Sequence, residues 1–192
     1  WQLIQKQGNT LRWANIEDKP QLKRRGYMLD ISRGRVPKVE TIKAVIDYLS
    51  ALKYNELQLY FEGMCFEYSA FPEYTADFAC LTAADIRLLD QYCAQRFIDL
   101  VPNQNSFGHM ASWLQHDRFR HLGLYEGEEI PNTLNPLLEE SYEFVQQLYE
   151  SVLPHFRSEY VNIGLDEAYG LGRYQIEEYC REKGKDLKIE VE

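Results

Sequence analysis

Two adjacent carboxylates, Asp166 and Glu167, come directly after a short and mostly apolar run at residues 160–165 (YVNIGL). Such a run is typical of a buried parallel strand, and β/α proteins place their chemistry at the C-terminal ends of these strands. Paired carboxylates at that position suit acid/base work on a glycosidic bond or the binding of a metal ion. An exposed acidic turn is the alternative that the same spacing allows.

Two further polar residues follow other predicted strands. Glu62 comes directly after the run at 56–61 (ELQLYF), and His109 lies in the sequence Ser-Phe-Gly-His-Met after the run at 99–103. Gly108 permits close approach of another backbone segment, and a histidine can bond a substrate hydroxyl or orient a carboxylate. Each residue alone is equally consistent with a loop acid or a structural histidine. Their shared position just past successive strands favours one common site.

An arginine precedes the first predicted strand. Arg25 begins the segment that ends near Asp30, and a guanidinium held there can donate paired hydrogen bonds to vicinal hydroxyls or to a carboxylate. The alternative is a solvent-facing arginine in the short basic run at 23–25. The four histidines lack partners at metal-ligand spacing, and the sequence has no Gly-rich phosphate loop and no Gly-x-Ser-x-Gly elbow. We therefore expect no metal and no cofactor.

The composition limits the classes of partner. Of the 192 residues, 45% are hydrophobic and 14% aromatic, which is typical of a globular domain with rings that often line sugar surfaces. The net charge of −9 disfavours nucleic acid, and no run of about 18 apolar residues is present to cross a membrane. The four cysteines form no Cys-x-x-Cys pair, which favours free thiols and a cytoplasmic location over a disulfide framework.

Strand-like and helix-like segments alternate along the chain. Strands are expected at residues 26–31, 56–61, 99–103 and 160–165, and helices at residues 37–53, 82–97, 135–152 and 172–183. Pro37 suits a first helical turn, while Thr82 and Asp85 have the spacing of a capping box. Such alternation predicts parallel strands joined by right-handed crossovers.

The lengths of the connections indicate the architecture. The connections after the second and third strands, at about residues 62–81 and 105–135, are long, whereas those from helix back to strand are short. This asymmetry is typical of a (β/α)8 TIM barrel, which takes about 250 residues. We expect an α/β fold of this type, with about the first four βα units in this chain. Residues 24–183 would form the partial barrel, residues 1–23 a lead-in segment and residues 184–192 a charged tail.

The chain resembles the catalytic domain of family 20 glycoside hydrolases, the β-N-acetylhexosaminidases, and is most similar to the hexosaminidase D branch. The matching segments are Arg25-Gly-Tyr-Met-Leu-Asp30 with Ser32-Arg33, then Phe107-Gly-His-Met110, Thr133-Leu-Asn-Pro136, and Ile163-Gly-Leu-Asp-Glu167 followed by Tyr169 and Leu171-Gly172. They occur in the family order over about residues 24–175. The combination is specific, although each segment alone is weak.

The resemblance implies a TIM barrel that hydrolyses terminal GlcNAc or GalNAc with retention of configuration. In this substrate-assisted mechanism, the acetamido oxygen of the sugar attacks its own anomeric carbon and forms an oxazolinium ion, so no enzyme nucleophile is needed. Asp166 would orient the acetamide and stabilise its developing positive charge. Glu167 would protonate the leaving oxygen and then activate water.

The resemblance also implies roles in sugar binding. Arg25 would match the family arginine that holds sugar hydroxyls in the terminal subsite, and His109 would match the histidine of the Gly-His motif. Glu62 would match an acid after the second strand, and Tyr169 would lie near the sugar. The expected partner is a glycan or glycoconjugate that ends in an N-acetylhexosamine.

The sequence departs from the family pattern at several points. Leu165 stands where the family often has a second glycine, and Asn105 stands where many members carry an acid. The second half of the barrel, which supplies aromatic walls of the family's sugar pocket, has no counterpart in these 192 residues. Unpaired sheet edges favour a fragment of a longer enzyme or self-association through those edges, and they leave open that the isolated piece is inactive.

Three functional hypotheses follow. The first is an exo-acting glycosidase, which the intact Asp166-Glu167 pair favours. The alternative is a non-catalytic sugar-binding or scaffold fragment of a degenerate barrel. The third is an open α/β domain of unrelated function, which would require these residues to form a closed core with covered sheet edges.

Overall fold

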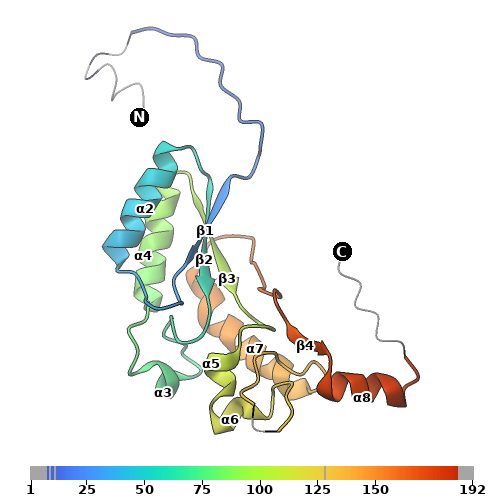
Figure 1. The fold of residues 1–192 in the computed structure, drawn as a ribbon. Helices are drawn as coiled ribbons and strands as arrows, with labels where there is room; N and C mark the ends of the chain where they lie inside the picture. The colour runs from blue at the N-terminus through green and yellow to red at the C-terminus, as the bar shows by residue number, and fades with distance from the viewer. Residues whose placement is uncertain (1–7, 9, 11, 128, 186–192) are drawn as a thin grey trace.

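Three parallel strands form the sheet at the centre of the molecule (Figure 1). The computed structural model describes residues 8, 10, 12–127 and 129–185. The strands are β1 (Gly26–Asp30), β2 (Glu56–Phe61) and β3 (Asp99–Gln104), in the order β1-β2-β3. Gly26 lies opposite Glu56, which lies opposite Asp99, so the C-terminal ends of the strands meet along one edge. The first three predicted strands are confirmed to within one residue at each end.

The helices occupy the connections between strands. They are α2 (Val39–Ala51), α3 (Pro72–Thr75), α4 (Ala83–Ala94), α5 (Ala111–Leu114), α6 (Asp117–Arg120), α7 (Glu139–Val152) and α8 (Tyr174–Glu182), with a 3-10 turn, η1 (Leu153–His155), after α7. Figure 1 shows α2 and α4 side by side against the sheet. Within the described residues, no helix combines the length and the apolar character needed to cross a membrane.

Local side-chain bonds explain where the predicted helices begin. The Thr82 side chain accepts from the Asp85 N–H, and the Asp85 carboxylate accepts from the Thr82 N–H, which confirms the capping box of α4. α7 begins at Glu139, later than the predicted start at Asn135. The Asn135 side chain accepts from the Leu137 N–H at 3.0 Å, so these residues form a turn before the helix.

The fourth predicted strand is reduced to one bridge, in which Asn162 pairs in parallel with Asn103. The N–H groups of Gln104 and Ser106 donate to the carbonyls of Asn162 and Gly164, so the segment does lie beside β3 in the predicted direction. The Asn162 side chain accepts from the Gly164 N–H, and Gly164 has φ +52°. This turn competes with a regular ladder, and the prediction of a continuous strand at 160–165 is wrong. A short strand, β4 (Tyr169–Gly172), follows instead.

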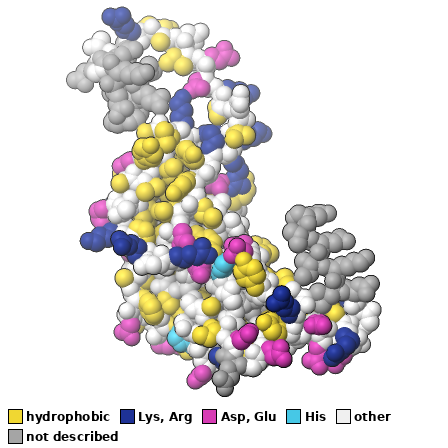
Figure 2. All heavy atoms as spheres, in the orientation of Figure 1, with side chains coloured by type: hydrophobic (Ala, Val, Ile, Leu, Met, Phe, Trp, Pro, Cys, Tyr) yellow, Lys and Arg dark blue, Asp and Glu magenta, His cyan; other side chains and the backbone are white. Residues whose placement is uncertain are grey.

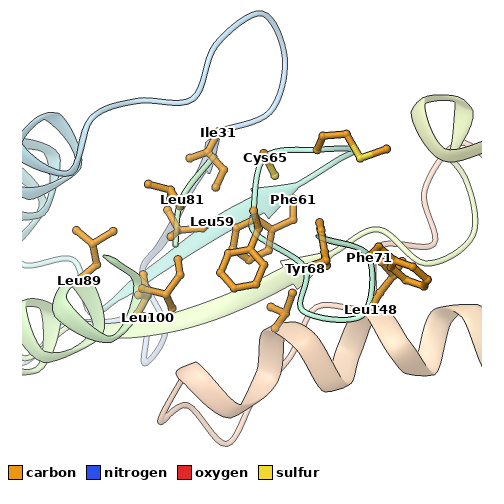
Figure 3. Packing of buried hydrophobic residues seen from close by; sticks show 14 of the residues in the cluster. Ile31, Leu59, Phe61, Cys65, Tyr68, Phe71, Leu81, Leu89, Leu100 and Leu148 are labelled. Atoms are coloured by element: carbon orange, nitrogen blue, oxygen red, sulfur yellow. The ribbon is translucent and has the colours of Figure 1, made fainter. Parts of the chain in front are cut away.

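The apolar core lies between the sheet and the helices. Figure 3 shows Leu59, Phe61 and Leu100 from β2 and β3 packed with side chains that include Leu89 of α4 and Leu148 of α7. A second part of this core lies between the two long connections and α7. Four rings surround Trp113 there at centroid distances of 5.3–5.7 Å: Tyr68 and Phe71 of the first connection, Phe119 of the second and Phe144 of α7. The long loops are therefore packed against each other and against α7, which gives them a defined shape.

The opposite face of the sheet is polar and partly open. The Asn103 and Asn162 side-chain amides both donate to Gln58 Oε1 at 3.1 Å. β1 is mostly exposed, and Tyr27 and Met28 on it are largely uncovered. Residues 1–7, 9 and 11 of the predicted lead-in segment and residues 186–192 of the predicted tail lie outside the described residues.

Candidate active site

The site lies where the parallel strands end. Figure 2 shows acidic, basic and histidine side chains gathered together near the middle of one face. His109 Nε2 is 3.2 Å from Glu167 Oε2 and 3.5 Å from Asp166 Oδ2, while His109 Nδ1 is 4.0 Å from Glu62 Oε2. The structure therefore brings together four residues singled out by the sequence: Glu62, His109, Asp166 and Glu167.

A glycine allows this close approach. A Cβ atom on Gly108 would lie 2.4 Å from the Asp166 carbonyl oxygen and 3.1 Å from the Glu167 carbonyl oxygen. The loop after β3 can therefore touch the backbone of the acidic pair only with glycine at this position, as the sequence indicated. His109 and Glu167 have φ values of +57° and +47° in the left-handed region, which non-glycine residues adopt infrequently. Such backbone strain is typical of functional sites.

The chemistry of the cluster depends on the histidine between the acids. The Asp166 and Glu167 side chains are 52% and 57% exposed, whereas that of His109 is 11% exposed. Within the described residues, no hydrogen bond of ordinary geometry reaches the buried Nε2 of His109. This nitrogen is therefore free to bond a carboxyl group or a substrate atom, and the acids are open to a ligand.

Arg33 belongs to a segment that carries the resemblance, but no site role was predicted for it from the sequence. Its Nη2 lies 2.9 Å from Glu62 Oε2. Asp30, at the end of β1, accepts from the Ser32 N–H at 2.9 Å and from the Arg33 N–H at 3.1 Å, and this turn directs Arg33 toward Glu62. Burial tends to raise the pKa of Asp30, but the hydrogen bonds from Ser32 and Arg33 outweigh burial and lower the pKa below its usual value.

Arg25 lies away from the acids. Its Nε donates to the Lys53 carbonyl at 2.7 Å and its Nη1 to the Leu22 carbonyl at 2.6 Å. These contacts lie at the N-terminal end of the sheet, because Arg25 precedes β1 and its carbonyl accepts from the Asn55 N–H before β2. The expectation that Arg25 shares a pocket with the acidic pair is therefore wrong. A residue before a parallel strand lies at the opposite edge from one that follows a strand.

Tyr169 lies beside the acidic pair. Its N–H donates to the Glu167 carbonyl at 2.7 Å, and its carbonyl accepts from Thr133 Oγ1 at 2.5 Å. The Glu167 carboxylate raises the pKa of the Tyr169 hydroxyl through its charge and a side-chain hydrogen bond. The exposed phenol thus stands at the rim of the same cluster, next to Glu167.

Comparison with known proteins decides the family. The family model for the catalytic domain of glycosyl hydrolase family 20 matches residues 23–190. The chain belongs to glycoside hydrolase family 20. Beta-hexosaminidase subunit beta of Entamoeba histolytica is 28% identical over 181 residues, which cover 85% of this chain and 32% of that protein. Hexosaminidase D of Bos taurus is 28% identical over 141 residues, which cover 73% of this chain and 40% of that protein.

Solved family 20 structures confirm the predicted fold class. The chitobiase of Flavobacterium johnsoniae matches with a TM-score of 0.73 and 26% identity, over 86% of this chain and 27% of that one. A GH20 exo beta-N-acetylglucosaminidase from Vibrio harveyi matches with a TM-score of 0.72 and 26% identity, over 89% of this chain and 32% of that one. These neighbours are (β/α)8 barrels, and this chain covers part of one. It spans about a third of the length of the curated relatives first matched.

Proposed function

We propose that the protein is an exo-acting β-N-acetylhexosaminidase that removes terminal GlcNAc or GalNAc from a glycan or glycoconjugate. Membership of family 20 and relatives named as hexosaminidases support this activity. One observation carries the proposal for this chain. Asp166 and Glu167 stand side by side at the C-terminal edge of the sheet, within 3.5 Å of the same His109 nitrogen.

The proposed reaction is retaining and substrate-assisted. The 2-acetamido oxygen attacks the anomeric carbon while the bond to the leaving oxygen breaks, and Glu167 gives that oxygen its proton. Asp166 orients the acetamide and offsets the positive charge of the oxazolinium ion. Glu167, now ionised, takes a proton from water, which opens the oxazolinium ring and restores the original anomeric configuration.

The remaining side chains support the two acids. In this proposal, the His109 ring holds the two carboxylates in place. The Glu62 carboxylate faces the opposite nitrogen of that ring and stabilises its orientation. Tyr169 lines the sugar pocket next to Glu167. Arg33 supplies, at the C-terminal edge, the guanidinium that was expected from Arg25.

The first test is turnover by the full-length native protein of nitrophenyl β-glycosides of GlcNAc and GalNAc. We expect nitrophenol release from both and none from the matching β-glucoside, which lacks the acetamide. Glu167→Gln should lower kcat by on the order of 10²-fold or more, because the general acid and base is lost. Glu143→Gln, an exposed acid on α7, is the matched control and should retain activity. Normal turnover by the Glu167→Gln variant would exclude the role given to this residue.

The same experiment separates the alternative reading. A non-catalytic sugar-binding module would bind N-acetylhexosamine without releasing nitrophenol.

We also propose a reducing, cytoplasmic environment, since all four cysteines are free thiols and Cys65 and Cys93 are buried. The exposed β1 edge, with Tyr27 and Met28, is the proposed surface for self-association, which the sedimentation behaviour of the chain tests.

A further inference from the structure

The hydroxyl of Tyr60 lies at the centre of a hydrogen-bond network beside the acids. It accepts from Asn105 Nδ2 at 2.8 Å and from Arg33 Nη2 at 3.3 Å, and it donates to Glu62 Oε2 at 3.3 Å. Only 5% of Tyr60 is exposed, and the Arg33 guanidinium lies 5.2 Å from the centre of its ring. Three side chains, one from each of three strand ends, thus converge on one buried oxygen.

The direction of the phenolic proton follows from this arrangement. Burial raises the pKa of Tyr60 to about 12, so the hydroxyl is neutral and carries one proton. A neutral phenol offers one donor and two acceptor positions. The amide of Asn105 and the guanidinium of Arg33 are donors here and occupy both acceptor positions. The single proton must therefore point at Glu62.

The same bonds explain the role of an amide at position 105. An ionised acid at this position, as in many family members, could only accept a hydrogen bond and would compete with Glu62 for the Tyr60 proton. The amide instead donates to the phenol. The departure at Asn105 therefore leaves Glu62 as the recipient of the Tyr60 proton.

Glu62 connects the Tyr60 hydroxyl to His109. The oxygen that accepts from Tyr60, Oε2, also lies 2.9 Å from Arg33 Nη2 and 4.0 Å from His109 Nδ1. The other nitrogen of His109 faces Glu167 and Asp166 at 3.2 and 3.5 Å. The Glu62 carboxylate thus faces one side of the imidazole ring while Asp166 and Glu167 face the other, so its placement affects how the ring is oriented toward the acids.

We propose that Tyr60 is a positioning residue for this site, whose hydroxyl holds Glu62 where it orients His109 toward Asp166 and Glu167. For its effect on turnover, the inference rests on the proposed hexosaminidase activity. For its effect on His109, it needs only the chain itself.

Tyr60→Phe removes the hydroxyl and keeps the ring. We expect kcat/KM of the full-length protein to fall on the order of tenfold, the usual effect of losing one hydrogen bond to an ionised group. Combined with Glu62→Gln, Tyr60→Phe should add little further loss, because both changes break the same link. Tyr68→Phe is the matched control: it also removes a buried hydroxyl, but one that donates to the Gln104 amide at 2.8 Å and not to a carboxylate. This control should not change kcat/KM.

A second measurement does not depend on activity. In ¹⁵N NMR spectra of the 192-residue chain, the His109 ring signals should move in Tyr60→Phe and in Glu62→Gln, and stay in place in Tyr68→Phe. Arg33→Gln changes the exposed side of the same network without altering the core, so the His109 signals should move there too, even if Tyr60→Phe folds poorly. His109 signals that are unchanged in folded Tyr60→Phe, or that stay in place in Arg33→Gln, would overturn the inference. Absence of turnover by the wild type would instead reject the proposed function and leave the NMR result to decide this inference.

Discussion

At the scale of single residues, the site depends on the contact between two loops that are distant in the sequence. Gly108 follows β3, and Asp166 follows the segment that pairs with β3. The backbone of one loop touches that of the other, so the carboxylate positions depend on how closely the loops approach. Small displacements at such a contact are expected to affect catalysis more than stability.

Gly108→Ala tests this contact. The added methyl group would lie 2.4 Å from the Asp166 carbonyl oxygen, so the acidic pair must move. We expect kcat to fall by on the order of 10²-fold while the chain stays folded. Gly127→Ala is the control: a Cβ there meets open space, so that substitution introduces only the strain of a positive φ, +64°, and no backbone clash. Equal activity losses in the two variants would show that the contact has no special role.

Some of the site residues could be predicted from the sequence, and others could not. Glu62, His109 and the Asp166-Glu167 pair could be located because each lies just past a strand, and parallel strands end along one edge. Arg25 was misplaced because it precedes its strand. Arg33 also lies just past the end of a strand, so the same criterion would have identified it as a site residue. Tyr60 gave no signal, since a tyrosine near the end of a buried strand is also typical of core packing.

At the scale of elements, the strands and the longer helices could be predicted from apolar spacing and caps, but the short helices could not. α3, α5 and α6 have four residues each, too few to show helical periodicity. Tertiary packing stabilises them instead: α5 carries Trp113, and Tyr74 of α3 and Phe119 of α6 pack against that ring. The fourth strand was overpredicted because its apolar residues suggested burial. In the structure, Val161 and Ile163 are partly exposed beside an open edge.

The turn that ends β1 yields a pH prediction. Asp30 accepts hydrogen bonds from Ser32 and Arg33, which lower its pKa in the folded chain. A lowered folded pKa means that the carboxylate stabilises the fold above the ordinary Asp pKa of about 4, and that this contribution disappears as pH falls through the lowered value. We expect Asp30→Ala to lower the free energy of unfolding by about 1 kcal/mol at pH 7.

Urea denaturation at several pH values checks this effect. The difference between wild type and Asp30→Ala should begin to shrink once the pH drops below about 4, where Asp30 is protonated in the unfolded chain, and should vanish below the lowered pKa of the folded chain. Asp77→Ala, at an exposed position between α3 and α4, serves as the control and should show little difference at any pH. A difference for Asp30→Ala that grows as the pH falls would contradict the assignment.

At the scale of the whole molecule, the two faces of the sheet have different roles. One face carries the apolar core and the helices, and the other presents amides such as Gln58 and Asn103 toward the open side. The acids therefore lie at the end of a sheet that is covered by helices on one face only. The segment that carries the acids has only a single bridge to β3, so other contacts must help to fix it.

An ion pair between an exposed arginine and a buried aspartate contributes to that attachment. Asp90 of α4 has a side chain only 8% exposed and pairs with the Nε of Arg157, whose Nη2 also donates to the Asp90 carbonyl at 2.8 Å. Next to it, Ser158 donates to Asp99 at the start of β3 at 2.8 Å. These bonds fix the chain immediately before residues 160–165, so the position of the acidic pair depends on a contact at the far end of the sheet.

Arg157→Ala should therefore destabilise the chain by about 2 kcal/mol, because it leaves the Asp90 carboxylate buried without its partner. Urea denaturation measures the loss, and amide hydrogen exchange should quicken most at residues 160–164. Adding Asp90→Asn should recover part of the stability, since the uncompensated charge is then gone. Arg181→Ala breaks a pair with Glu178 that is exposed on both sides, and it should change stability by less than about 0.5 kcal/mol. If both arginine variants lose the same small amount, the segment is fixed by its backbone bonds to β3 alone.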